Sequence, residues 1–211
     1  MSAPLEQTRD RVFNIPNQLT AARLVLSIVV FALIPLGQYL AAMIVFAIAA
    51  GTDWIDGYWA RKYNQVTQLG RIFDPFVDKI IICGAFVLLA VEMRAVGEIA
   101  WYARIDGWMA VVVIGREMLV TALRAFVEQS GGDFSAKLAG KLKMVFQCAA
   151  AIAALLALHY AAPDNPAETI PPWLLWTLIA SIWLAVISTI YSGLEYVIVA
   201  ARYIRTPARK P

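Results

Sequence analysis

DWIDGYWARKYNQVTQLGRIFDPFVD, residues 53–78, is the stretch that decides the fold and the chemistry of this chain. Four aspartates lie in it, inside or beside apolar segments: Asp53, Asp56, Asp74 and Asp78. A bare carboxylate at membrane depth is costly, so an ionisable group there is a functional hypothesis by default. We therefore expect a bound ion or partner among these four side chains.

The spacing of the aspartates predicts how they meet. Asp53 and Asp56 are three residues apart, and Asp74 and Asp78 are four apart, so each pair lies on one face of a helix. The polar run 61–68 between the pairs predicts a loop, which makes the two helices antiparallel. Asp56 then faces Asp74, and Asp53 faces Asp78 one turn deeper. Four negative charges this close repel strongly unless cations lie among them.

Oxygen-only ligation indicates the kind of ion. It selects hard divalent ions, so we expect Mg²⁺ or Mn²⁺, with Ca²⁺ as a further option. Zinc is disfavoured because His159, Cys83 and Cys148 lie alone, without ligand spacing. Two ions held by shared carboxylates are suited to activating a phosphoryl oxygen and its leaving group together.

The complete pattern resembles the signature of the CDP-alcohol phosphotransferase family. Eight fixed residues at fixed gaps carry the resemblance: Asp53, Asp56, Gly57, Ala60, Arg61, Gly70, Asp74 and Asp78. Polar residues at a helix end would explain one pair of aspartates at best. A proton relay would explain the aspartates but would not require the glycines, the alanine and the arginine. A match of this length is far more specific than a lone glycine motif.

Further positions resemble the phosphatidylglycerophosphate synthase branch of the family. They are Asn17, Leu19, Thr20, Arg23, Gly115, Arg116, Glu117, Arg124, Gly140, Lys141, Lys143, Gln147 and Tyr191–Gly193. The resemblance covers the chain from Asn14 to about Tyr196. It implies transfer of a phosphatidyl group from CDP-diacylglycerol to sn-glycerol 3-phosphate, giving phosphatidylglycerophosphate and CMP.

The family also implies a role for each matching residue. Asp53, Asp56 and Asp74 would hold two divalent ions, and Asp78 would complete the metal site and act as general base on the acceptor hydroxyl. The CDP moiety would be accommodated or contacted by Asp56, Gly57, Ala60, Arg61 and Gly70. The resemblance further suggests a homodimer.

Clustered cations predict where the phosphate of the acceptor binds. Lys137 and Lys141 are four residues apart on one helix face, and Arg116 and Arg124 lie on the preceding apolar segment. An Arg116–Glu117 ion pair and the binding of lipid headgroups are the competing interpretations. Lys143 lies on another face of its helix and is expected to snorkel to the membrane interface.

The composition predicts an integral membrane protein with a single all-α domain. Of its 211 residues, 61% are hydrophobic, well above the soluble average. Six apolar runs, each near the ~20 residues that a spanning helix needs, predict a bundle of six transmembrane helices. The runs cover residues 18–37, 39–60, 73–93, 107–127, 138–160 and 172–200. Residues 1–17 form a cytoplasmic or interfacial segment, with a short interfacial helix or a disordered tail, and 201–211 form a basic cytoplasmic tail.

The basic residues predict the orientation. All eighteen lysines and arginines except Arg94 and Arg104 fall toward the side of both termini. The positive-inside rule makes that side cytoplasmic, together with the aspartates, in the inner membrane. Its charge attracts anionic lipids or an anionic substrate, whereas so little water-exposed surface argues against nucleic acid.

Three rival interpretations remain at this point. The acceptor can be inositol phosphate, which would use the same cations, or serine, which needs fewer of them. A divalent-cation or proton-coupled transporter would use the aspartates as an ion path, and would predict ion flux without nucleotide.

Overall fold

The described part of the chain is entirely helical. The computed structural model describes residues 15–63, 68–97, 99–129, 138–161 and 170–205, and the side chains of residues 15–17, 53–63, 68–74, 128–129, 138–139, 141 and 203–205 lie outside that description. The described residues form α1 (Ile15–Leu33), α2 (Tyr39–Tyr63), α3 (Gln68–Val96), a short 3-10 helix η1 (Trp101–Ala103), α4 (Gly107–Gln129), α5 (Leu138–Ala161) and α6 (Pro172–Arg205).

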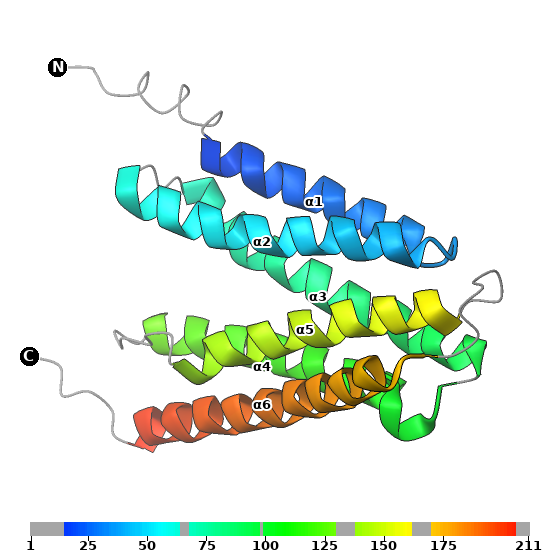
Figure 1. The fold of residues 1–211 in the computed structure, drawn as a ribbon. Helices are drawn as coiled ribbons and strands as arrows, with labels where there is room; N and C mark the ends of the chain where they lie inside the picture. Colours follow the sequence, from blue (N-terminus) through cyan, green and yellow to red (C-terminus); the bar gives the residue numbers. More distant parts are fainter. Residues whose placement is uncertain (1–14, 64–67, 98, 130–137, 162–169, 206–211) are drawn as a thin grey trace, which may run out of the picture.

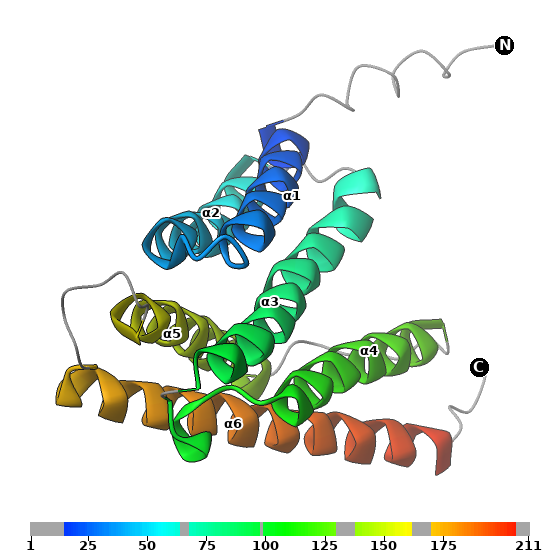
Figure 2. The same ribbon diagram turned by 90° about the vertical axis from the view of Figure 1, so that its right-hand side faces the viewer.

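The six α-helices run alternately up and down (Figure 1). One end of the bundle gathers the starts of α1, α3 and α5 and the ends of α2, α4 and α6. Helix α1 packs on α2 and α3, α5 packs on α2, α3 and α6, and α4 packs on α3 and α6. Helix α3 therefore crosses between the α1–α2 pair and the α4–α6 group, as the turned view shows (Figure 2).

Glycine and proline mark several helix ends. Gly37, with φ of 71°, follows α1, where its amide donates to the carbonyl of Ile34 and the next amide donates to that of Leu33. This is the Schellman arrangement, which requires a left-handed residue that glycine adopts without steric cost. Gly97, with φ of 73°, likewise follows α3. Pro172 opens α6, where a missing N–H costs no hydrogen bond.

A continuous apolar core fills the bundle. Its largest fully buried side chains include Phe46, Phe86, Leu89, Met93, Leu155, Leu158, Leu178 and Ile182. Gly84 of α3 permits the closest approach, because an added Cβ would lie 2.2 Å from Cζ of Phe31 on α1. The absence of a side chain at Gly84 thus leaves room for the ring of Phe31.

The prediction of an all-α fold is confirmed within the described residues, and each of the six apolar runs coincides with a helix. Some predicted boundaries are wrong. The expected loop 61–68 is helical at both ends, since α2 continues to Tyr63 and α3 begins at Gln68, and α3 extends to Val96, beyond the end of the predicted apolar run at residue 93. The proposed N-terminal interfacial helix and most of the C-terminal tail fall outside the described residues.

Apolar side chains also cover the outside of the helices. Exposed large hydrophobic residues occur on every one of the six helices, for example Ile28, Ile44, Val91, Val111, Val145 and Ile187. Within the described residues, two helical segments are long and apolar enough to cross a membrane, Leu142–Ala161 and Pro172–Arg202. Shorter apolar stretches of the same kind lie at Gln18–Leu33 and Tyr39–Thr52.

Candidate active site

The aspartates lie on two consecutive helices. Asp53 and Asp56 belong to the second half of α2, and Asp74 and Asp78 to the first half of α3. Each pair is therefore one helical turn apart, as the spacing predicted. Among these four carboxylates, only that of Asp78 belongs to the described side chains, so the predicted convergence stays a prediction.

The signature's remaining positions lie on the same two helices. Gly57, Ala60 and Arg61 belong to α2, and Gly70 belongs to α3. Among the described side chains, no three His, Cys, Asp or Glu residues lie together as a metal site would need, and three of the four aspartates are outside that set.

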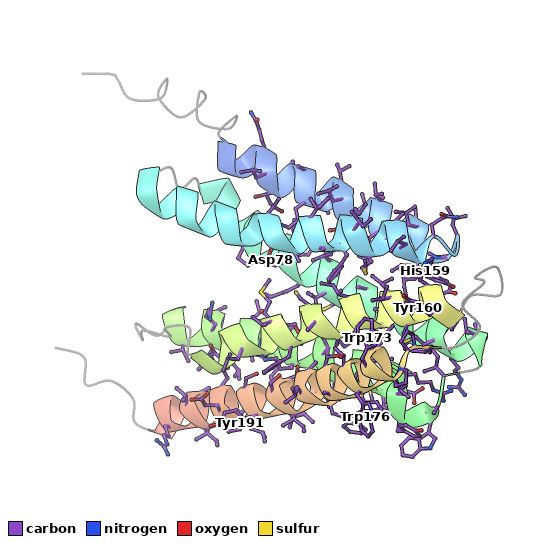
Figure 3. All side chains as sticks on the ribbon, viewed as in Figure 1. Asp78, His159, Tyr160, Trp173, Trp176 and Tyr191 are labelled. Atoms are coloured by element: carbon purple, nitrogen blue, oxygen red, sulfur yellow. The ribbon has the colours of Figure 1, made fainter. Side chains whose placement is uncertain are left out.

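Asp78 forms an ion pair with Arg23 of α1. The distance from Nη1 of Arg23 to Oδ1 of Asp78 is 2.6 Å, within the range of a charge-assisted hydrogen bond. The side chain of Arg23 is 2% exposed and that of Asp78 is 26% exposed. Asp78 therefore keeps access to solvent or ligand while a buried guanidinium holds one of its oxygens. Figure 3 shows Asp78 on α3, well away from His159 and Tyr160 near the end of α5.

A second charged group links α4, α5 and α6, and we call its residues Arg116, Glu117 and Lys143 the interhelical ion cluster. Oε1 of Glu117 accepts from Nζ of Lys143 and from Nη1 of Arg116, the latter at 3.1 Å. The Nε of Arg116 donates to Oγ of Ser192 at 3.2 Å, and its guanidinium lies 5.4 Å from the centroid of the Tyr196 ring.

The cluster decides two of the sequence-based interpretations. The ion pair between Arg116 and Glu117 is confirmed. The expectation that Lys143 snorkels to the interface is wrong, because this residue is 7% exposed and pairs with Glu117 in the interior. Lys143 lies on a different face of α5 from Lys141, as predicted. That face contacts α4, however, and not lipid.

Lys79 extends the positive charge towards the aspartates. It follows Asp78 directly on α3, and its Nζ donates to Oγ1 of Thr121 on α4. Thr121 in turn donates to the main-chain carbonyl of Glu117 at 2.7 Å. Consecutive residues of α3 therefore contact α1 through Asp78 and α4 through Lys79.

The other predicted acceptor residues are only partly described. Arg124 lies two turns after Arg116 on α4, and its Nε is enclosed without a hydrogen-bond partner among the described residues. Lys141 belongs to the first turn of α5, while its side chain, and Lys137 altogether, lie outside the described part. Of the four predicted residues, the structure thus brings Arg116 into a defined set of contacts.

Sequence reasoning assigned no role to the contacts of Arg23 or Lys143. Arg23 and Asp78 are 55 residues apart, and Lys143 and Glu117 are 26 apart. The sequence could have predicted an interior partner for Arg23, because a cation in the middle of an apolar helix needs one.

Comparison with known proteins identifies the family of the chain. The family model for CDP-alcohol phosphatidyltransferase matches residues 13–191, which include all the predicted site residues. The chain belongs to the CDP-alcohol phosphatidyltransferase family. The family resemblance drawn from the eight-residue signature is thereby confirmed.

Relatives within this family match over nearly their whole length. A protein of Bacillus subtilis (strain 168) is 34% identical over 202 residues, covering 88% of this chain and 94% of its own. One of Pseudomonas fluorescens is 35% identical over 205 residues (93% and 95%), and one of Escherichia coli (strain K12) is 32% identical over 189 residues (87% and 93%). Each is named CDP-diacylglycerol–glycerol-3-phosphate 3-phosphatidyltransferase. This member of the family is a transferase of phospholipid biosynthesis.

Proposed function

We propose that the chain transfers a phosphatidyl group from CDP-diacylglycerol to sn-glycerol 3-phosphate, giving phosphatidylglycerophosphate and CMP. The observation that carries the proposal is the family match over residues 13–191, with the eight-residue signature complete on α2 and α3. The three relatives align over most of this chain, and their names support glycerol 3-phosphate as the acceptor.

All six helices span the membrane in this proposal, and the transmembrane domain covers residues 18–200. The apolar side chains on the outside of the helices support it, because a patch of that extent in water would favour aggregation. The end of the bundle at which α1 begins and α6 ends lies on the cytoplasmic side, since the excess of lysine and arginine falls there. The active site opens to the cytoplasm at that end.

Mg²⁺ or Mn²⁺ fits the donor set, because four carboxylates without nitrogen or sulfur ligands match the preference of hard divalent ions. Asp53, Asp56, Asp74 and Asp78 would hold two such ions. The partial exposure of Asp78 leaves its carboxylate accessible from outside the protein interior. When bound, the ions neutralise charge on the β-phosphate of the donor and on departing CMP.

Asp78 acts as the general base in this proposal. The hydroxyl oxygen of glycerol 3-phosphate forms a bond to the β-phosphorus, which carries the diacylglycerol. The bond from that phosphorus to the bridging oxygen breaks, and CMP leaves with the bonding electrons. The hydroxyl proton passes to the Asp78 carboxylate, whose orientation Arg23 fixes through the 2.6 Å contact.

The two substrates approach from different helices. The nucleotide lies along Asp56, Gly57, Ala60, Arg61 and Gly70, where small residues leave the backbone accessible. The phosphate of the acceptor binds the cations Arg116, Lys137, Lys141 and Arg124. The diacylglycerol chains remain in the bilayer, which the apolar outer faces of the helices adjoin.

A competition assay tests the proposal. Purified protein receives CDP-diacylglycerol, Mg²⁺ and equal amounts of glycerol 3-phosphate, inositol phosphate and serine, and the lipid product is identified by mass spectrometry. We expect phosphatidylglycerophosphate, with CMP released in equal amount. A product containing inositol or serine would refute glycerol 3-phosphate as the acceptor. Ion flux in liposomes without nucleotide, in the absence of any lipid product, would overturn the enzyme and favour a transporter.

The proposed assembly is a homodimer, as the family resemblance suggests. Mass measurement of the protein in nanodiscs tests it, and a single chain per particle would contradict it.

A further inference from the structure

The interhelical ion cluster contains more positive charge than a structural ion pair needs. Arg116, Glu117 and Lys143 have side chains only 9–10% exposed, and two cations converge on one oxygen of a single carboxylate. A buried pair of one acid and one base is neutral, whereas the charges of these three described side chains sum to +1. An additional buried cation is expensive unless an anion completes the group. The charge balance therefore points to a function beyond joining α4 to α5.

The contacts of Arg116 fix the plane and direction of its guanidinium. Nη1 is held by Glu117, Nε by Ser192, and the face by the ring of Tyr196. Gly193 lets the side chain lie against α6, since a Cβ there would approach Cγ of Arg116 to 3.2 Å. An arginine in solution samples many rotamers, and three fixed contacts remove that freedom before any ligand arrives.

The remaining nitrogen of Arg116 lies on the side of α5 where that helix begins. A Cβ added to Gly140 would lie 4.0 Å from Nη2 of Arg116 and 3.5 Å from Oη of Tyr196. Gly140 belongs to the first turn of α5, which starts at Leu138. Main-chain amides at a helix start favour negative charge, and Gly140 brings the first turn of α5 close to this nitrogen.

From this geometry we propose that Glu117 is a positioning residue for the acceptor. Its carboxylate orients Arg116 so that Nη2 is presented to the phosphate of the acceptor at the start of α5. Lys143 neutralises Glu117, so Arg116 retains its full charge for the ligand. This assignment rests on the proposed function, because glycerol 3-phosphate is the anion that Arg116 would receive.

Two double variants separate positioning from simple structural stabilisation. Glu117→Leu/Lys143→Met and Glu117→Gln/Lys143→Met both remove one negative and one positive charge, so the net charge of the cluster stays the same. They differ in one property, because the Gln amide oxygen still accepts a hydrogen bond from Nη1 of Arg116 and Leu does not. The Gln/Met variant keeps a hydrogen-bond acceptor for Arg116 and should fold, whereas the Leu/Met variant leaves the buried guanidinium without its carboxylate and should be less stable.

The readout is the KM for each substrate, with thermal unfolding as a check on folding. We expect the Leu/Met variant to raise the KM for glycerol 3-phosphate about tenfold or more, the size of a lost hydrogen bond to a charged group. The Gln/Met variant should stay within about threefold of the wild type, and the KM for CDP-diacylglycerol should be unchanged in both. Equal acceptor KM values for the two double variants, or an equal change for both substrates, would overturn the proposal.

Two further variants keep the test decisive. Asp106→Asn removes the acidic partner of Arg104, 3.2 Å away and distant from the cluster, and should leave both KM values unchanged. If the Leu/Met protein fails to fold, Glu117→Asp keeps the charge and withdraws the carboxylate by one methylene, and an unaltered acceptor KM in that variant would overturn the proposal. A wild-type protein that does not use glycerol 3-phosphate would refute the proposed function itself, whereas an active wild type with unaffected variants would refute only the role of Glu117.

Discussion

Replacing Arg23 with glutamine should weaken the fold and the chemistry together. The contact between Nη1 of Arg23 and Oδ1 of Asp78 is 2.6 Å long, and the two side chains are 2% and 26% exposed. Exposed ion pairs contribute about 0.2–1 kcal/mol, and breaking a fully buried pair costs about 3–5 kcal/mol. A pair with one buried and one partly exposed member lies between these limits, so we expect a coupling energy of about 2 kcal/mol.

A double-mutant cycle measures that energy. The cycle uses Arg23→Gln, Asp78→Asn and the double variant, each unfolded in the same detergent with a chelator present. Repulsion between Asp78 and the other aspartates affects the Asp78→Asn step with or without Arg23, so it cancels in the coupling term. The Arg104–Asp106 pair serves as the control, because it is a partly exposed ion pair, with side chains 21% and 20% exposed, that lies just before α4 and touches neither Arg23 nor Asp78.

The same contact also predicts an effect on catalysis. If Arg23 orients the general base, Arg23→Gln should lower kcat about tenfold or more while the KM for CDP-diacylglycerol changes little, since misplacing a reacting group by about 1 Å is costly. The control variants of the Arg104–Asp106 pair should keep the kcat of the wild type. A coupling energy below about 0.5 kcal/mol would equal that of a solvated pair and refute the reasoning. An unaltered kcat in Arg23→Gln would refute the positioning of Asp78 by Arg23.

Four further perturbations test the remaining steps. Asp78→Asn should abolish turnover while equilibrium binding of CDP-diacylglycerol stays measurable, and residual turnover would remove the base assignment. Chelation with EDTA should stop lipid transfer until Mg²⁺ or Mn²⁺ is restored, and activity that survives chelation would contradict a metal-dependent reaction. Gly84→Ala should lower the free energy of unfolding by about 1–3 kcal/mol, because the new methyl group meets the ring of Phe31, and trimming that ring in Gly84→Ala/Phe31→Leu should restore part of it. Tyr39→Phe removes the 3.2 Å hydrogen bond to Glu92 and should cost about 1 kcal/mol in thermal unfolding without changing kcat, which an altered kcat would contradict.

The helices and the fixed spacing of the site were predictable because they depend on local sequence. Each apolar run long enough to form a spanning helix coincides with a helix, and three- or four-residue gaps between aspartates place them one turn apart whatever surrounds them. The adjacent pair of Arg116 and Glu117 was accessible to the same local reasoning.

Contacts between helices were not predictable in this way. The position of Lys143 relative to Lys141 follows from the helical period, but its surroundings do not. A helix apolar on nearly all sides gives no periodic signal to separate the face that meets another helix from the face that meets lipid. The pairing of Arg23 with Asp78 similarly depends on α1 lying beside α3, a fact of the tertiary structure.

The position of α3 connects Asp78 with the helix that carries Arg116. Asp78 and Lys79 are consecutive, so their side chains leave the helix about 100° apart. One contacts α1 and the other contacts α4, the helix that carries Arg116. In the proposed reaction, the base that deprotonates the acceptor and the cations that hold its phosphate are therefore connected through a single turn of α3. A rotation of this helix about its axis would move Asp78 and Lys79 together, and the close contact of Gly84 with Phe31 opposes such a rotation. A larger residue at position 84 should consequently lower kcat as well as stability, and an effect on stability alone would show that the orientation of α3 is set elsewhere.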